Sequence, residues 1–137
     1  MSFEVFVQCF EGGEPAGMDR KAIRALFPVV EAASERNHWK VRYNRKNESE
    51  IYLAPLASKA AQVKGFTVSR PCADIRLWEA LLAILKGHPA VLYFPGDGPL
   101  VAHRETCRQM PPDMVEALGR PKVVKTAKDI LAAVAAE

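Results

Sequence analysis

Residues 73–86 constrain the fold of this chain more than any other segment. Apolar side chains recur along them at helical spacing, and charge is left mainly on Arg76, Glu79 and Lys86. Such a narrow polar stripe predicts a helix that is buried on more than one side. Gly87 follows the last helical residue and favours termination there. The apolar positions are Ile75, Leu77, Trp78, Leu81, Leu82, Ile84 and Leu85, of which Trp78 and Leu82 are predicted to be among the least exposed.

Two segments in which apolar and polar side chains alternate predict a β-hairpin. Only an even register places both apolar sets on one face of the hairpin. We therefore predict that Val41 pairs with Ile51 and Trp39 with Leu53, joined by a connection over residues 44–48. The apolar set is Trp39, Val41, Tyr43, Ile51 and Leu53, and the other face pairs Arg42 with Glu50 and Lys40 with Tyr52.

Segments bounded by proline and glycine supply the other predicted strands. Residues 3–10 are largely apolar at both odd and even positions, which predicts a strand covered on both faces. Residues 11–17 are expected to form a turn or loop, and another loop is expected after Pro55. Further strands are predicted at residues 66–69, 90–94, 100–102 and 123–124.

Capping residues mark the starts of the other predicted helices. Asp19 is a candidate N-cap for a helix over residues 20–27, and a second helical turn is expected over residues 28–33. Thr126 is expected to cap the last helix, with Asp129 three residues on in a capping-box arrangement. Helical turns are also predicted at residues 103–110 and 112–118.

The resulting order, β-α-β-β-β-α-β-β-α-β-α, predicts a single α+β domain over residues 1–137. We expect a mixed, largely antiparallel sheet of about five to six strands with helices packed on it. The chain of 137 residues is 49% hydrophobic and 26% charged, which is typical of one globular domain with its own core.

No segment has the pattern of a targeting or membrane-spanning sequence. No apolar run approaches the roughly 20 residues needed to cross a bilayer, and residues 1–4 show no basic region ahead of an apolar stretch. The cysteines, Cys9, Cys72 and Cys107, are odd in number and lack CxxC spacing, so we expect free thiols. These features predict a cytoplasmic protein without membrane contact.

Cysteines and histidines are the candidates for catalysis or metal binding. Cys72 directly precedes the strongest helix, a position from which a thiol can act as the nucleophile of a small enzyme. No GxSxG motif occurs, and no cysteine has the arginine of a phosphatase loop six residues on. His103 and Cys107 could share a helix face but lack the further ligands that zinc needs, and the glycines at 12–13 and 96–98 match no nucleotide-binding motif. We therefore predict no catalytic residue, metal or cofactor. The alternative is a small enzyme that uses Cys72 as its nucleophile.

Positive charge is concentrated in the middle of the chain. The net charge is +3, and residues 35–70 hold eight basic and three acidic side chains. This excess lies beside the hairpin tyrosines and predicts a contact surface for a protein partner at the hairpin and its tip. A nucleic acid bound through residues 36–46 is an alternative, because basic groups contact phosphates and tyrosines stack on bases. The predicted partner-binding residues are Lys40, Arg42, Tyr43, Arg45, Lys46 and Tyr52.

Two segments resemble stretches of known proteins. Residues 70–81 (RPCADIRLWEAL) and 91–96 (VLYFPG) are similar to segments of small, uncharacterised bacterial α/β proteins, some of which are immunity proteins. Immunity proteins neutralise a cognate toxin by binding it, so the resemblance implies a toxin as the partner. Inhibitors of basic nuclease toxins are usually acidic, so this slightly basic chain implies another kind of toxin or contact through a local acidic patch. The candidate acidic residues are Glu4, Glu11 and Glu14.

Overall fold

The computed structural model describes residues 3–33, 37–56, 59–95 and 98–135, and these residues form one α+β domain. They contain ten strands and five helices. The strands are β1 (Glu4–Glu11), β2 (Glu14–Pro15), β3 (Met18–Asp19), β4 (Val29–Ala33), β5 (His38–Asn44), β6 (Asn47–Leu56), β7 (Lys59–Ser69), β8 (Ala90–Tyr93), β9 (Leu100–Val101) and β10 (Lys122–Val123). The helices are α1 (Arg20–Arg24), α2 (Ile75–Gly87), the 3-10 helix η2 (Arg104–Gln109), α3 (Pro112–Leu118) and α4 (Ala127–Ala135).

All ten strands belong to one mixed sheet. Eight follow the order β10-β9-β8-β1-β7-β6-β5-β4, with β2 paired to β1 and β3 paired to β7. Strands β9 and β10 pair in parallel, and the other pairs of described strands are antiparallel. The predicted fold class is confirmed, but the expected five to six strands were too few. Strands β2 and β3 were not predicted because each has only two residues, and β4 was expected to be helical.

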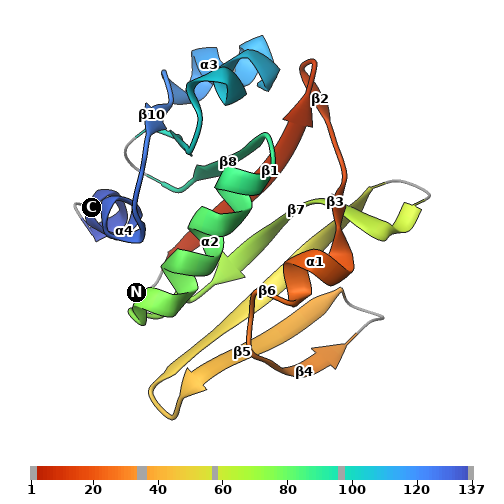
Figure 1. Ribbon diagram of the computed structural model, residues 1–137, viewed down its shortest axis with the longest axis vertical. Helices are drawn as coiled ribbons and strands as arrows, with labels where there is room; N and C mark the ends of the chain where they lie inside the picture. The colour runs from red at the N-terminus through yellow and green to blue at the C-terminus, as the bar shows by residue number, and fades with distance from the viewer. Residues whose placement is uncertain (1–2, 34–36, 57–58, 96–97, 136–137) are drawn as a thin grey trace.

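One face of the sheet carries a layer formed by α1, α2 and α4 (Figure 1). Strand β1 sends Val5 and Val7 to this side, because alternate side chains of a strand point to opposite faces. Leu77, Trp78 and Leu81 of α2 are fully buried against them and their neighbours. The main core therefore lies between α2 and the middle strands of the sheet. None of the described helices is long and apolar enough to cross a membrane.

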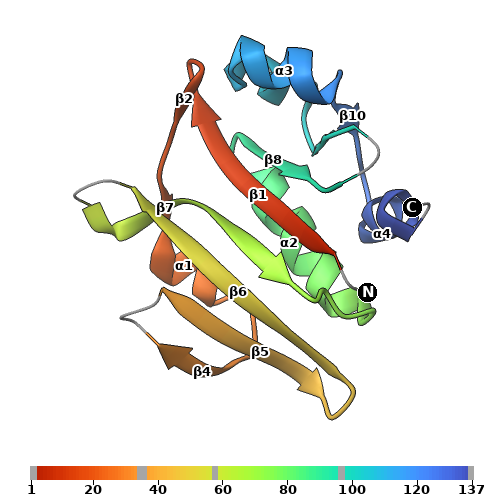
Figure 2. The same cartoon turned by 180° about the vertical axis from the view of Figure 1, so that it is seen from behind.

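The opposite face of the sheet is covered at one end only. Met110, which follows η2, and side chains of α3 pack there with those of β1, β8 and β9 in a second, smaller cluster. Residues 3–10 are thus covered on both faces only near Phe10, whereas Phe6 and Gln8 are half-buried. Figure 2 shows the rest of this face without a helix over it. The buried members of the cluster are Phe10, Val91, Val101 and Met110, and Tyr93, Met114 and Val115 pack against them.

The hairpin of β5 and β6 has the predicted faces but a different register. Trp39, Val41, Ile51 and Leu53 are all buried in the core, as the alternation requires. Trp39 pairs with Ile51 and Val41 with Ser49, so each predicted pairing was wrong by two residues although its parity was right. On the other face, Lys40 pairs with Glu50, Arg42 with Glu48 and His38 with Tyr52.

A tight turn and a buried serine account for this shift. The Asn44 side chain accepts a hydrogen bond from the backbone N–H of Asn47 (3.0 Å), which closes a shorter connection than expected. Ser49 then occupies a core position, where its hydroxyl donates to the Arg70 carbonyl (3.0 Å) and accepts from the Cys72 N–H (2.9 Å). A polar side chain that is satisfied in this way can occupy the core, and alternation of apolar residues does not predict it.

Some stretches predicted as loop or helix are strands instead. Strand β7 begins at Lys59 rather than at residue 66, and β6 continues past Pro55 to Leu56, where a loop was expected. Residues 28–33, expected to form a helical turn, include the edge strand β4. Hydrogen bonding to neighbouring strands overrides the weak local signals in these segments. Residues 57–58 of the expected loop lie outside the described residues.

The helix predictions are largely confirmed. Asp19 caps α1, and the Asp129 carboxylate accepts from the Thr126 N–H (3.0 Å) while Asp129 N–H donates to the Thr126 hydroxyl (3.1 Å), which completes the capping box of α4. Trp78 is fully buried, as expected. Leu82 is only half-buried, contrary to the prediction, because it lines a groove between α2 and the start of α4.

The start of α2 contains a carboxylate whose protonation affects stability. Asp74 caps the helix and accepts hydrogen bonds from Arg76 through the guanidinium (2.9 Å) and the backbone N–H (3.0 Å). The side-chain bond is the larger cause that holds the pKa of Asp74 at about 2, below its usual 3.8. Because the pKa is lower in the folded protein, the carboxylate stabilises the fold above about pH 4, and this contribution is lost as the pH falls toward about 2.

Replacing Asp74 by asparagine should therefore make stability less sensitive to acid. Asparagine keeps a capping oxygen but does not titrate. Between about pH 4 and about pH 2, the urea midpoint of Asp74→Asn is expected to fall less than that of the wild-type protein. An equal fall in both proteins would show that other carboxylates carry all of the acid sensitivity.

Candidate functional site

The face of the sheet opposite α2 is here called the open face. It extends over β1, β7, β6 and β5, as Figure 2 shows. Side chains that lie between two core residues of a strand point out of this face. Phe6 lies between the buried Val5 and Val7, and Tyr52 lies between two buried residues of β6. The side chains of the open face are therefore those of the alternate residues in each strand that point away from the main core.

Four rings and one threonine lie side by side across five neighbouring strands of the open face. Phe6 of β1 is opposite Tyr93 of β8, and their rings stack with centroids 5.1 Å apart and planes 17° apart. On its other side Phe6 is opposite Thr67 of β7, which is opposite Tyr52 of β6. Tyr52 is opposite His38 of β5, with ring centroids 4.7 Å apart. We call Tyr93, Phe6, Thr67, Tyr52 and His38 the aromatic row.

A shallow hollow of about 230 Å³ lies beside the middle of the aromatic row. Gly65 of β7 lines it, and β1 approaches so closely there that a Cβ at this position would clash with the Val7 carbonyl oxygen. Gln8 also lines the hollow, and its Oε1 accepts a hydrogen bond from the Tyr93 hydroxyl (3.4 Å). The hollow thus places polar groups next to apolar rings, a combination typical of binding surfaces.

Charged side chains of both signs flank the aromatic row. Arg42 Nε donates a hydrogen bond to Glu48, and Lys40 Nζ lies 3.7 Å from the same carboxylate. The Arg42 hydrogen bond is the larger cause that lowers the pKa of Glu48. His38 Nε2 lies 3.3 Å from Glu50 Oε1. Among the described residues of the open face, three basic side chains, Lys40, Arg42 and Lys64, stand against three acidic ones, Glu4, Glu48 and Glu50.

The structure separates the six residues that we predicted to bind a partner. Lys40, Arg42 and Tyr52 lie on the open face, whereas Tyr43 packs against the core on the other face. There the Arg76 guanidinium lies over the Tyr43 ring, 5.0 Å from its centroid, and burial raises the pKa of Tyr43. Tyr43 therefore does not lie on the open face with Lys40, Arg42 and Tyr52.

The tip of the hairpin forms the rim of the open face. Arg45 and Lys46 are exposed in the turn between β5 and β6. The observed register places Glu48 opposite Arg42, so part of the positive charge expected on the hairpin is neutralised next to the turn. The first residue of the segment 36–46 considered for nucleic-acid binding lies outside the described residues.

Cys72, the alternative nucleophile, is 9% exposed. Its carbonyl accepts a hydrogen bond from Trp78 Nε1 (3.1 Å), and its N–H donates to the Ser49 hydroxyl, so its backbone is fixed at the start of α2. All three cysteines are free, and Cys107 is more accessible than Cys9 or Cys72, which are buried. A thiol reagent should therefore reach Cys107 before it reaches Cys72.

The two residues considered for a metal site face different hollows. His103 Nε2 lies 2.9 Å from the Lys86 carbonyl at the end of α2, whereas Cys107 lines another cavity. Within the ranges that the structure describes, no three His, Cys, Asp or Glu side chains form a group that could hold a metal ion.

The candidate acidic patch is divided by the length of β1. Glu4 begins this strand, and Glu11 ends it opposite Glu14. A strand of eight residues spans roughly 20 Å or more, so these three carboxylates do not act as one cluster.

Among the members of the aromatic row, sequence reasoning identified Tyr52 as a partner-binding residue and included His38 only within the segment 36–46 considered for nucleic-acid binding. Alternation places Phe6 on the face opposite Val5 and Val7, and this signal was present in the sequence. The pairing of Phe6 with Tyr93 joins strands that are far apart along the chain, and no local pattern specifies it. The row becomes visible only when the strand order is known.

Comparison of the chain with models of protein families, with curated proteins and with solved structures finds no match. The assignment of the candidate site therefore rests on the geometry and chemistry of the residues described above.

Proposed function

We propose that this protein is a binding module that forms a stoichiometric complex with a folded protein, and that the open face is its contact surface. The aromatic row is the observation that carries this proposal. It places four rings and one threonine at successive opposite positions on five strands, which span roughly 20 Å at a strand spacing of about 4.8 Å. That width suits the apolar centre of a protein interface of standard size.

The composition of the row supports a protein partner. Aromatic side chains are enriched at the centres of interfaces, and tyrosine is frequent among the residues that contribute most to binding. Tyr52 is 44% exposed, although it lies in the middle of a long strand. A ring held on a sheet loses little conformational freedom when a partner covers it, so its burial is available to stabilise a complex.

The charges around the row indicate the chemistry of the partner. The described basic and acidic side chains of the open face cancel, and Lys40 and Arg42 are already paired with Glu48. A nucleic acid would need unpaired cations along its phosphates, so this balance favours a protein over the nucleic-acid alternative. The partner we expect presents an apolar patch bordered by charges of both signs.

The resemblance of residues 70–81 and 91–96 to segments of immunity proteins implies a more specific form of this proposal, in which the partner is a toxin that the protein neutralises. Such a protein is encoded beside its toxin, so a gene for a large secreted toxin directly upstream would support it. If no such gene lies next to the gene for this protein, the proposal of a binding module still stands, but a toxin is excluded as its partner.

Catalysis by Cys72 is the competing function, and its burial argues against it. A nucleophile must reach its substrate, whereas Cys72, which precedes α2, is buried with only 9% of the residue exposed. Labelling with a thiol reagent across pH separates the two functions. Modification of Cys72 ahead of the more accessible Cys107 would favour the enzyme.

Truncation of Tyr52 tests the proposed contact surface. We expect Tyr52→Ala to weaken binding to a partner captured by the wild-type protein at least about tenfold, because a central aromatic side chain contributes strongly to binding. Leu26→Ala is the matched control, since Leu26 is 41% exposed and follows α1 on the other side of the sheet. Equal affinities of Tyr52→Ala and wild-type protein would place the interface elsewhere.

Variants in the exposed turn between β5 and β6 provide a second test of the contact surface. Charges at the rim of an interface chiefly raise the association rate with an oppositely charged surface, and salt weakens that effect. The double variant Arg45→Glu, Lys46→Glu should therefore associate more slowly at low salt and lose part of the salt dependence. The same rate and salt dependence as the wild-type protein would exclude the hairpin tip from the interface.

A further inference from the structure

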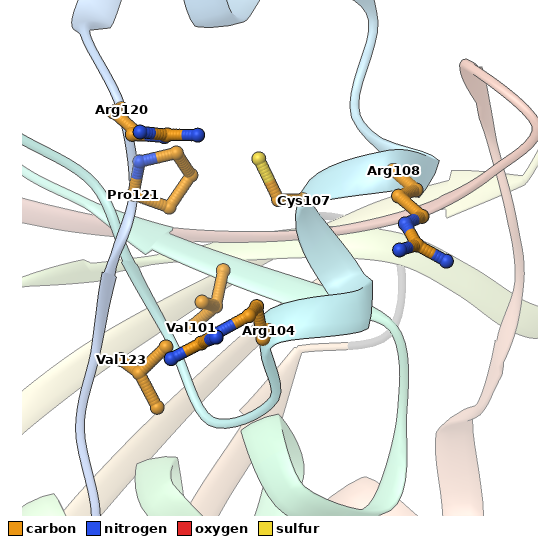
Figure 3. Close-up of a pocket in the computed structure, with 7 residues that line it drawn as sticks. All are labelled: Val101, Arg104, Cys107, Arg108, Arg120, Pro121 and Val123. Atoms are coloured by element: carbon orange, nitrogen blue, oxygen red, sulfur yellow. The ribbon is translucent and has the colours of Figure 1, made fainter.

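A second hollow lies away from the open face, between η2 and the segment that leads into β10 (Figure 3). Its volume is about 530 Å³, more than twice that of the hollow beside Gly65. The parallel pairing of β9 and β10 brings its two walls together, and the Val124 N–H donates to the Val101 carbonyl (2.8 Å) to extend that pairing. The lining residues are Val101, Arg104, Cys107, Arg108, Arg120, Pro121 and Val123.

The 3-10 geometry of η2 sets which side chains face this cavity. With three residues per turn, side chains three positions apart lie one above the other. Arg104 and Cys107 therefore share one side of η2, and Figure 3 shows them facing the segment that carries Arg120 and Pro121. The guanidinium of Arg108 is turned to the other side of the helix in the same view.

The cavity combines an apolar floor with uncompensated positive charge. Val101 is buried beneath it, and Val123 and Pro121 line one wall. None of the described residues that line it is acidic. Within the part of the chain that the structure describes, neither Arg104 nor Arg120 makes an ion pair or a side-chain hydrogen bond. Two guanidinium groups that line one hollow create a positive potential that favours binding of an anion.

We propose that this cavity binds a small organic phosphate. A phosphomonoester carries about two negative charges near neutral pH, which match the two guanidinium groups that face the cavity. Arginine presents paired N–H donors that fit the oxygens of a phosphate, and Val101, Pro121 and Val123 contact the organic group. This inference goes beyond the proposed function, because the site needs neither the open face nor a protein partner.

Phenyl phosphate is the probe that tests the site. We expect it to bind the wild-type protein in a calorimetric titration and to slow the modification of Cys107 by the neutral reagent 4,4′-dithiodipyridine. In that reaction the Cys107 sulfur attacks one sulfur of the reagent, a mixed disulfide forms, and one thiopyridone leaves. The Cys107→Ser variant identifies the fraction of the signal that comes from this thiol. Inorganic phosphate should bind more weakly, because it lacks a group that contacts the apolar wall.

Substitution of the two arginines gives the expected loss. Arg104→Gln and Arg120→Gln should each weaken phenyl phosphate binding at least about tenfold, as expected for the loss of a charged hydrogen-bonding partner. Both side chains are exposed, so these variants should keep the thermal midpoint of the wild-type protein. Arg24→Gln is the matched control, since Arg24 is an exposed arginine of α1 that lines neither hollow; it should leave binding unchanged.

Three results would overturn the proposal. The first is that phenyl phosphate neither binds nor protects Cys107 at millimolar concentrations. The second is that phenol protects Cys107 as well as phenyl phosphate does, which would make the cavity an apolar site. The third is that benzoate binds more tightly than phenyl phosphate, which would make it a carboxylate site. None of these results bears on the open face, so the proposed function is tested separately.

Discussion

Replacing Leu81 by alanine should lower the free energy of unfolding by about 2–5 kcal/mol, because it empties a fully buried position in the main core. The same change at the adjacent Leu82 should cost only roughly 1 kcal/mol. Leu82 is half-buried and lines the groove between α2 and α4, where solvent can fill the space left by the missing atoms. Both variants remove the same atoms from a leucine of α2, so the difference between their losses of unfolding free energy reports the difference in burial of the two side chains.

Urea or guanidinium denaturation measures both losses, and equal m-values for the variants justify the comparison. Similar losses at the two positions would show that the groove beside Leu82 is closed in solution. A loss below about 1 kcal/mol at Leu81 would show that α2 is peripheral, contrary to the fold described here.

Gly65 is the second position at which we expect a large effect. A Cβ added there would overlap the carbonyl oxygen of Val7 and press on the backbone of Gln8, so β1 and β7 would have to separate. These two strands form the middle of the sheet. Gly65→Ala should therefore destabilise the protein by about 1–3 kcal/mol or more, as is typical of overpacked sites.

Gly87 is the matched control for this substitution. It is the last residue of α2, and a Cβ there would meet nothing within 4 Å. Gly87→Ala should be neutral or stabilising by up to about 1 kcal/mol, because alanine is the better helix former. If Gly65→Ala were equally harmless in thermal unfolding, the close approach of β1 to β7 would not exist in solution.

Local patterns predicted the elements whose signals are local. The narrow polar stripe of residues 73–86 predicted α2, and the side chains of Asp19 and Thr126 predicted the starts of α1 and α4. Alternation also predicted which hairpin residues enter the core. Each of these features depends on residues that are close together in the sequence, so a local pattern is enough to predict it.

Features that depend on distant partners were not predictable in the same way. Strand β4 was expected to be helical because Pro28 can begin a helix, but pairing with β5 makes it an edge strand. The hairpin register depends on Ser49, whose hydroxyl is satisfied by groups near the start of α2. The aromatic row and the arginine-lined cavity likewise join residues from separate strands and helices, so neither leaves a motif along the chain.

The most direct test of the open face as a binding surface is cross-linking in the cells that encode the protein. A photoreactive p-benzoylphenylalanine at position 52 keeps an aromatic ring in the row, and the same residue at position 26 is the control. We predict one discrete adduct with a host protein from position 52 and none from position 26. Adducts from position 26, with none from position 52, would contradict the proposed interface.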